Sequence, residues 1–520
     1  MAGTQRQLIG LLSLVLVSFV FADEQKLDPS NGEEGDRFGW SVATSGDYAV
    51  IGAPYAEVDG NVNKGAAYVF HRSGGTWSQQ AELAASDDDP GEYFGTSVGI
   101  SGEYIIVGAP QEWSTGTGAG AAYIFKRSGS SWTEQAKIVP IDTWRAYDEF
   151  GTSVSISSIA GSAYAAIGAP YDDEHGEDSG SLYIFHRTAG DTWVQEAELF
   201  NEYSASEDHF GHSVFISSLG TVVIAGAPGD DIGSNEDQGS ARVFMRDGSS
   251  WNPTATLTAS EGTSYDEFGS AVAVSGIGAD IIVGAQKDPG NGSGCGAAYV
   301  YHYDGDWIQQ ARLFPTGGDG WDWFGRSVAI NGIGDRVVIG SLGDDALGDG
   351  SGAIYAYEAN GSSWEYHGKR VASDGTEEDI FGKSVAILPG PVFAGAPQDS
   401  PQGLFSGSAY VYEWDDLESF PAMTLYFEFV GYTVGRIWWD GISGAQEYRL
   451  YRFTSPFYQF DADTENPWYV VGANSTEVTF SAGIGDPDVN YYFVGVAAAP
   501  GQSSPKSNVV GEFDFDVDVP

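Results

Sequence analysis

The chain has 520 residues, with 73 acidic and 23 basic side chains and a formal net charge of −50. So acidic a surface repels nucleic acids and anionic membranes, which excludes a general binder of either, and it attracts cations and basic partners. The single cysteine, Cys295, excludes an intramolecular disulfide framework. An aromatic content of 14% predicts a folded chain and excludes an acidic disordered one.

The N-terminal segment has the features of a targeting sequence. Residues 8–20 form an apolar run that follows Arg6 and ends close to the small residue Ala22. The run is too short to predict a transmembrane helix. We therefore interpret residues 1–22 as a signal peptide, and we expect a mature protein that is secreted or held at the cell surface, with no membrane span.

A repeated unit fills residues 23–420. A Phe-Gly pair recurs seven times, and the separations between successive phenylalanines are 56, 56, 60, 58, 56 and 57 residues. Gly-Ala-Pro follows the pair in five copies and has decayed in the fifth and sixth. A regular period of this length is typical of a stacked or radial array. The pairs begin at Phe38, Phe94, Phe150, Phe210, Phe268, Phe324 and Phe381.

Each copy contains four predicted strands. In the second copy, apolar runs at 97–100, 104–107, 121–125 and 132–139 are separated by turns and by a glycine-rich loop. Four antiparallel strands make a blade, and seven blades make a propeller. With its two motifs in fixed order, the unit resembles the FG-GAP repeat of integrin α-subunit heads and of many secreted bacterial proteins. The resemblance implies an all-β, seven-bladed β-propeller and a role in adhesion.

The two ends of the repeat region complement each other. Residues 26–30 align without a gap on residues 82–86, which belong to a predicted fourth strand. The sequence before residue 26 does not contain the other three strands of a blade. The seventh copy in turn has three strands and then departs from the pattern at Trp414. We predict that the N-terminal segment supplies the fourth strand of the last blade and closes the ring.

Acidic residues gather on the links between blades and on the loops between the second and third strands, which share one end of the propeller. Carboxylates on glycine-containing loops suit calcium, a hard cation with tolerant geometry. The integrin calcium loop lies between the first two strands, where this chain has only short turns, so its ligands cannot be carried over. The alternative is an acidic surface of solvated carboxylates. The predicted calcium ligands are Asp172, Asp173, Asp178, Asp230, Asp231, Asp237, Asp344, Asp345 and Asp349.

No catalytic residue is predicted. Residues 95–99 match the G-x-S-x-G pattern of serine hydrolases, but they are one variant of a repeated strand without the required helix. His71, His186 and His302 share one position in the repeat, which argues against a unique catalytic base. Carboxylate pairs for glycoside hydrolysis stay open, because distance in space decides them.

After Pro421 the FG and GAP motifs no longer recur. Seven apolar, β-branched and aromatic segments in about 90 residues predict a β-sandwich over residues 421–513. The Trp438-Trp439 pair, the segment 445–452 and the segment 491–496 resemble a fibronectin type III domain. The resemblance implies a spacer or binding module. Residues 514–520 form an acidic tail.

The leading functional prediction is a non-enzymatic recognition or adhesion protein. Its acidic propeller face would bind an extracellular protein or glycan, with calcium as the cofactor. One alternative is a secreted enzyme, or its accessory module, that acts on an extracellular polymer. The other is a structural element of a surface layer or matrix.

Overall fold

A computed structural model describes residues 24–414 except 88, 114–115, 142–145, 160, 203–204, 291–293 and 316–319, and it describes strands only between 425 and 511. The predicted signal peptide and the acidic tail lie outside the described residues. Within the described part, no helix is long and apolar enough to cross a membrane.

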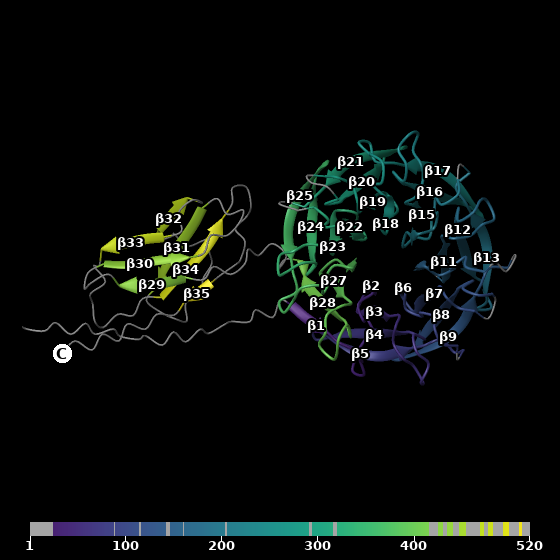
Figure 1. Cartoon of the computed structure of the whole chain (residues 1–520), viewed down its shortest axis with the longest axis horizontal. Coiled ribbons are helices and arrows are strands. Elements are labelled where there is room, and N and C mark those ends of the chain that lie inside the picture. The colour runs from purple at the N-terminus through teal and green to yellow at the C-terminus, as the bar shows by residue number, and fades with distance from the viewer. Residues whose placement is uncertain are drawn as a thin grey trace, which may run out of the picture.

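Seven antiparallel sheets of four strands each are arranged radially, as predicted from the repeat (Figure 1). We number the blades in the order of their FG pairs. Blades 1 to 3 contain β2 (Ser41–Ser45), β3 (Tyr48–Ala53), β4 (Ala66–Ser73) and β5 (Thr76–Leu83); β6 (Ser97–Ser101), β7 (Tyr104–Ala109), β8 (Ala121–Ser128) and β9 (Ser131–Ile138); β10 (Ser153–Ile159), β11 (Ser162–Ala169), β12 (Ser181–Arg187) and β13 (Trp193–Leu199). Blades 4 and 5 contain β14 (Ser213–Ile216), β15 (Val222–Ala227), β16 (Ser240–Asp247) and β17 (Ser250–Leu257); β18 (Phe268–Val274), β19 (Asp280–Ala285), β20 (Ala297–Tyr303) and β21 (Trp307–Leu313). Blades 6 and 7 contain β22 (Phe324–Ile330), β23 (Arg336–Ser341), β24 (Ala353–Asn360) and β25 (Ser363–Arg370); β26 (Ser384–Ile387), β27 (Pro391–Ala396), β28 (Ser408–Glu413) and β1 (Glu24–Leu27).

The hydrophobic core lies between blades. One cluster joins Val50 and Val69 of blade 1 to Ile105 and Val107 of blade 2. A four-stranded sheet has two apolar faces and cannot cover either alone, so each blade is buried by its neighbours. The FG phenylalanine belongs to this core, since Phe94 is fully buried and packs edge-on against Tyr123.

The FG and GAP glycines are explained by close backbone contacts between adjacent blades. Gly95 has a φ of +95°, and a Cβ there would lie 2.4 Å from the carbonyl oxygen of Ala66. A Cβ on Gly52, the GAP glycine of blade 1, would lie 2.0 Å from the carbonyl oxygen of Gly95. Both distances are shorter than any non-bonded contact, so only glycine fits at either position.

A buried acid lies two residues before every FG phenylalanine. Asp208 accepts the N–H of Ala205 at 2.6 Å, and Asp266 accepts that of Thr263 at 2.6 Å, so the carboxylate caps the turn that enters the blade. Burial raises the pKa of Asp208 to about 7 and that of Asp36 to about 6. The seven acids are Asp36, Glu92, Asp148, Asp208, Asp266, Asp322 and Asp379.

Blade 7 closes the ring as the sequence predicts. Strand β1 pairs antiparallel with β28, with Lys26 opposite Tyr410 (Figure 1). The side-chain amide of Gln25 also donates to the carbonyl of Trp77 in blade 1, and its oxygen accepts the N–H of Trp77. The N-terminal strand therefore completes the last blade and contacts the first.

The C-terminal region contains the strands β29 (Leu425–Phe429), β30 (Val434–Trp439), β31 (Glu447–Phe453), β32 (Tyr469–Gly472), β33 (Glu477–Ser481), β34 (Tyr492–Ala498) and β35 (Val509–Gly511). They form a three-stranded sheet in the order β29-β30-β33 and a four-stranded sheet in the order β32-β31-β34-β35. These pairings define two sheets but not their packing, so the fibronectin type III sandwich remains a prediction.

Candidate binding site at the propeller axis

The innermost strands meet around the axis. The residue after each FG pair directly precedes such a strand in five blades and is its third residue in blades 5 and 6. Unlike the FG pair, this position varies from blade to blade. Only blades 2 and 3 share a residue type, a threonine. In blade order the residues are Trp40, Thr96, Thr152, His212, Ser270, Arg326 and Lys383.

Three cations converge at this axial mouth. The Lys383 ammonium lies 4.6 Å from the centre of the Trp40 ring, and the Arg37 guanidinium lies 4.6 Å from the centre of the Tyr55 ring. Arg326 and Arg37 both act electrostatically on Lys383, although the three side chains come from blades 6, 1 and 7. Blades 6, 7 and 1 are consecutive in the closed ring, and their innermost strands β22, β26 and β2 are in contact.

These cations have no carboxylate partner. Within the described part of the chain, no Asp or Glu oxygen lies at ion-pair distance from Arg37, Arg326 or Lys383. By contrast, lysines such as Lys26, Lys126 and Lys369 each have a carboxylate oxygen within 3.2 Å. Glu267 acts on Arg326 from farther away, but its carboxylate is engaged by Lys287 at 2.5 Å. In a chain with a net charge of −50, three unpaired neighbouring cations are unexpected.

Burial and the neighbouring cations lower the pKa values of Lys383 and His212. Desolvation, Arg326 and Arg37 together hold the pKa of Lys383 well below its ordinary value. Desolvation, followed by Arg326, His209 and Lys383, lowers the pKa of His212 to about 3. His212 is therefore a neutral imidazole at physiological pH. An anion placed among the three cations would raise both pKa values, because it would oppose the effect of the neighbouring cations.

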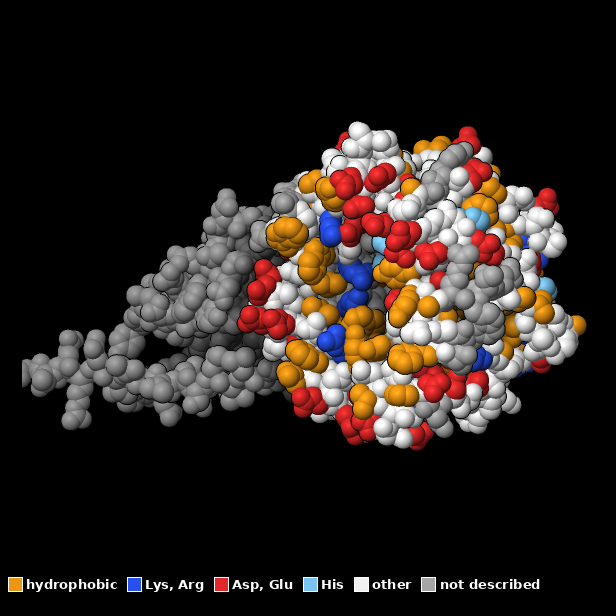
Figure 2. All heavy atoms as spheres, turned by 45° about the vertical axis from the view of Figure 1, so that its right-hand side comes forward, with side chains coloured by type: hydrophobic (Ala, Val, Ile, Leu, Met, Phe, Trp, Pro, Cys, Tyr) orange, Lys and Arg blue, Asp and Glu red, His pale blue; other side chains and the backbone are white. Residues whose placement is uncertain are grey.

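A hollow opens beside the cations between blades 1 and 2. It has a volume of about 430 Å³ and is lined by Trp40, Pro54, Tyr55, Tyr93, Thr96, Pro110 and Gln111. The rings of Tyr55 and Tyr93 meet edge to face at 5.1 Å. Figure 2 shows Lys and Arg side chains next to hydrophobic ones in a hollow of the propeller, with Asp and Glu side chains around it. The prediction of an acidic face holds for the surroundings of the hollow, whereas its centre is cationic and aromatic.

Exposed aromatic side chains gather on the same face. Among the described residues, ten Phe, Tyr and Trp side chains are exposed, and all but Tyr303 and Tyr366 lie on links or on loops between second and third strands. Aromatic residues are enriched at recognition surfaces because they offer a large contact area at a low entropic cost. The eight are Trp113, Tyr147, Tyr171, Phe200, Tyr265, Phe314, Trp321 and Trp323.

The nine predicted calcium ligands lie on three loops of this face, where the carboxylates of the Asp-Asp pairs accept hydrogen bonds within the blade. The first aspartate of each Asp-Asp pair is buried and accepts a hydroxyl of the third strand, as Asp172 does from Tyr183 at 2.5 Å. Asp230 and Asp344 accept from Ser240 at 2.5 Å and from Tyr355 at 2.7 Å.

The second aspartate of each pair accepts a backbone N–H from its own loop. Asp173, Asp231 and Asp345 accept from Asp178 at 2.8 Å, Asp237 at 2.9 Å and Gly350 at 2.8 Å. The carbonyl of Asp349 accepts the N–H of Glu378 at 2.8 Å. Calcium at these loops remains a prediction. Among the described residues, three metal-binding side chains come together only at Asp87, Glu92 and Glu112.

Comparison with known proteins identifies the repeat. The FG-GAP repeat matches residues 21–70, 77–125, 132–185, 193–244, 251–301, 307–357 and 364–412. The chain belongs to the FG-GAP repeat family. Each match after the first begins in the fourth strand of one blade and ends in the third strand of the next, so the sequence repeat is offset from the structural blade.

No curated protein matches the chain. Among solved structures, the periplasmic gluconolactonase of Pseudomonas aeruginosa is similar at 13% identity and a TM-score of 0.43, over 65% of this chain and 86% of that one. A similarity of this size carries no argument about function.

The sequence analysis missed the axial cations. The signal was present in the residue after each FG pair, since a position that varies inside a strict repeat is under a different constraint from its neighbours. It was hidden because Arg326 and Arg37 are distant in sequence, and only the closed ring brings them together.

Proposed function

We propose that this FG-GAP protein is a secreted, non-enzymatic recognition protein that binds an acidic glycan at the axial mouth of its propeller. The observation that carries the proposal is the group of three cations without carboxylate partners, Arg37, Arg326 and Lys383, beside a hollow lined by aromatic rings. Desolvated cations that repel one another are costly, and an anionic ligand would offset that cost.

The chemistry of the hollow favours a sugar that carries a carboxylate. A uronate ring presents an apolar face that can stack on Trp40 or Tyr55, and its carboxylate can accept charge-assisted hydrogen bonds from Arg326 and Lys383. The acidic residues around the hollow would repel a polyanion that approaches them directly. The end of an acidic polysaccharide therefore fits the hollow better than its middle does.

The remaining parts of the chain fit an extracellular recognition protein. Residues 1–22 would direct export, and the C-terminal strands would form a fibronectin type III module that acts as a spacer or a second binding unit. The three- and four-stranded sheets of that region support the module, because a sandwich of this kind needs two antiparallel sheets. Adhesion to a glycan-bearing surface follows from these assignments.

Calorimetric titration of the full mature chain with a short oligouronate tests the proposal. The neutral oligosaccharide with the same linkage is the control. We expect the oligouronate to bind at least roughly tenfold more tightly, with an affinity that falls as salt is added. Equal binding of both sugars, or of neither, would contradict the glycan assignment. Binding of an acidic peptide alone would replace the glycan by a protein ligand.

His212 favours an enzyme as the second candidate. Its imidazole lies near Arg326 and Lys383, and a uronate carboxylate bound beside these cations would raise the pKa of His212 from about 3. The imidazole could then take the proton α to that carboxylate as the bond to the 4-linked sugar oxygen breaks. Incubation with a polyuronate separates the two functions. An enzyme would produce unsaturated ends that absorb in the ultraviolet, and this absorbance would be lost in His212→Ala. A binding protein would leave the polymer intact.

A further inference from the structure

Three carboxylates meet at blade 2, on the link that enters it and on the loop between its second and third strands. One ligand oxygen from each of Asp87, Glu92 and Glu112 lies within 4.8 Å of the other two. Glu92 and Glu112 are both 0% exposed. Neither carboxylate oxygen of Glu92 has a hydrogen-bond partner. An ionised carboxylate buried without a partner is strongly destabilising, so either Glu92 takes up a proton, as burial and the neighbouring acids favour by raising its pKa to about 8, or a further positive charge compensates it.

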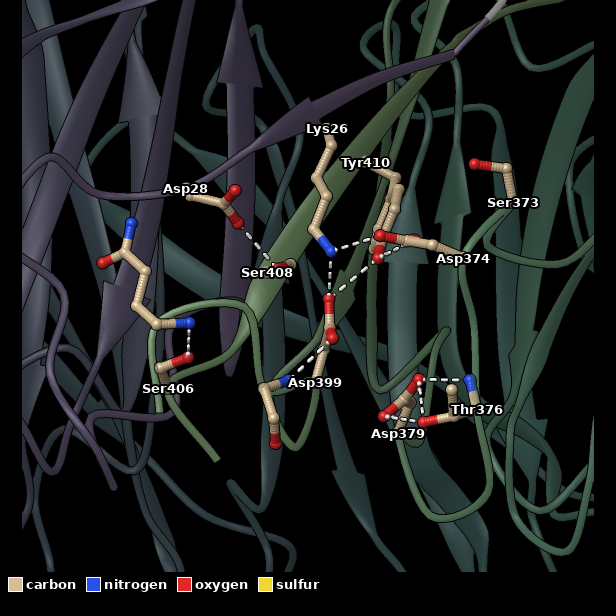
Figure 3. Close-up of polar contacts among 12 residues, drawn as sticks. Lys26, Asp28, Ser373, Asp374, Thr376, Asp379, Asp399, Ser406, Ser408 and Tyr410 are labelled. Atoms are coloured by element: carbon tan, nitrogen blue, oxygen red, sulfur yellow. Dashed lines mark hydrogen bonds and ion pairs between the residues drawn. The ribbon is translucent and has the colours of Figure 1, made fainter. Parts of the chain in front are cut away.

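Blade 7 contains the equivalent cluster and serves as an internal reference (Figure 3). There Lys26 contacts Asp374 and Asp399, both at 2.6 Å, and the Tyr410 hydroxyl donates to the same two carboxylates at 2.7 and 2.9 Å. Both carboxylates of this cluster therefore accept hydrogen bonds from Lys26 and from Tyr410.

In blade 2 the corresponding lysine is Lys137. It contacts Asp87 at 2.5 Å and Glu112 at 2.8 Å, and the Tyr123 hydroxyl donates to Asp87 at 2.8 Å. The two blades therefore share a lysine, a tyrosine and two acids at matching positions.

The two blades differ at the acid that precedes the FG pair. In blade 7 this residue is Asp379, whose carboxylate accepts the N–H of Thr376 at 2.5 Å and a hydrogen bond from the Thr376 hydroxyl (Figure 3). In blade 2 it is Glu92, which is one methylene longer, and its carboxylate reaches the cluster instead. Six of the seven blades have aspartate here, so Glu92 is the exception in the repeat.

Charge counting indicates what the cluster lacks. When all three carboxylates are ionised, they and one ammonium leave a net charge of −2 in blade 2, whereas Lys26 with Asp374 and Asp399 leaves −1 in blade 7. One divalent cation would neutralise the blade 2 cluster.

We propose that Asp87, Glu92 and Glu112 bind a divalent cation, and that calcium is the cation they suit. Calcium prefers oxygen ligands at 2.3–2.6 Å and tolerates irregular geometry, so one ion can contact three oxygens that lie within 4.8 Å of one another. Lys137 is 25% exposed, so its ammonium can move toward solvent as the ion enters.

The position gives the ion a place in the binding face. Glu92 directly precedes Tyr93, and Glu112 directly follows Gln111, and both Tyr93 and Gln111 line the axial hollow. An ion that joins Glu92 to Glu112 ties these two wall segments together.

Thermal melting of the full chain with calcium alone, at ~1 mM against chelator, tests the site. We expect calcium to raise the melting temperature of the wild type by roughly 1–2 °C. Glu92→Gln should abolish this rise. It should also raise the melting temperature in chelator, because it removes an unpartnered buried charge. That second readout shows that the variant is folded.

The matched variants are Glu92→Asp and Asp379→Glu. Glu92→Asp should behave like blade 7 and lose the calcium response, whereas Asp379→Glu in the Glu92→Gln background should create a response in blade 7. An unchanged wild-type melt in calcium would overturn the site and indicate that Glu92 carries a proton. A rise that survives Glu92→Gln but is lost when Asp230 and Asp231 are both changed to Asn would place the ion in the Asp-Asp loops instead.

Discussion

At the blade interfaces the same residues recur in every copy, whereas the propeller axis presents a different side chain in nearly every blade. The recurring FG and GAP glycines are held in backbone contacts that admit no other residue, as at Gly52 and Gly95. The variable position contributes Arg326 and Lys383, which have no carboxylate partner among the described residues. We infer that the residues repeated in every blade hold the scaffold together, and that the residues that vary between blades are available to bind a ligand.

The same reasoning applies to Glu92. Its six counterparts are aspartates, and Asp36, Asp208, Asp266 and Asp379 accept a backbone N–H of the preceding turn. Glu92 is one methylene longer and is buried. If variable positions carry function while repeated positions carry stability, changes in the two classes should affect different measurements.

Removal of the closing strand should give the largest effect on stability. A chain that lacks residues 24–30 loses the pairing of β1 with β28 and the two ion pairs of Lys26, and it exposes the edge of blade 7. We expect the melting temperature to fall by more than ~10 °C. Replacement of the same residues by serines, which keeps the backbone pairing, should give a smaller loss. An unaltered melt of the shortened chain would show that the ring does not depend on this strand.

A single methyl group at a blade interface should come next. In Gly108→Ala the new Cβ would lie 2.0 Å from the carbonyl oxygen of Gly151, a backbone atom that cannot move without shifting blade 3. We expect a loss of at least ~3 kcal/mol in the free energy of unfolding, measured by denaturant titration. Gly332→Ala is the control, because a Cβ there meets no atom within 4 Å. Similar losses for both variants would refute the close-contact explanation of the motif.

The buried acids of the link turns should give a smaller effect that depends on pH. The folded-state pKa of Asp208 is raised to about 7, so the folded chain binds this proton more tightly than the unfolded chain. Its contribution to stability is therefore complete below about pH 4 and is lost as the pH rises through 7. Asp208→Asn keeps the acceptor for Ala205 and should flatten the decline of melting temperature between pH 4 and 7. An equally steep decline in the variant would remove Asp208 as a cause.

Much of the fold could be predicted from the sequence because its constraints are local and repeated. The FG and GAP motifs reflect contacts between neighbouring blades, and the fit of residues 26–30 to a fourth strand was sufficient to predict the ring closure that β1 provides. The candidate site could not be predicted in the same way. Arg37 and Lys383 are separated by almost the whole propeller sequence, and the missing partner of Glu92 becomes evident only when its burial is known.

The Asp-Asp loops show how much a carboxylate's role depends on its neighbours. Their composition indicates calcium, but Asp172, Asp230 and Asp344 are engaged by hydroxyl groups of the adjacent strand. Composition alone cannot tell a carboxylate that folds a loop from one that waits for a ligand. The distinction depends on which donors the fold places within hydrogen-bond distance.

The most direct test of the account is a paired measurement on Arg326→Met/Lys383→Met, with oligouronate binding and thermal melting recorded on the same samples. Lys287→Met is the control, because it removes a cation from the same face that is already paired with Glu267. The account predicts that the double variant loses oligouronate binding and melts at the same or a higher temperature, since two like charges without partners have been removed. Binding that persists at wild-type affinity, or a melting temperature that falls as in Gly108→Ala, would contradict the claim that these cations serve a ligand and not the scaffold.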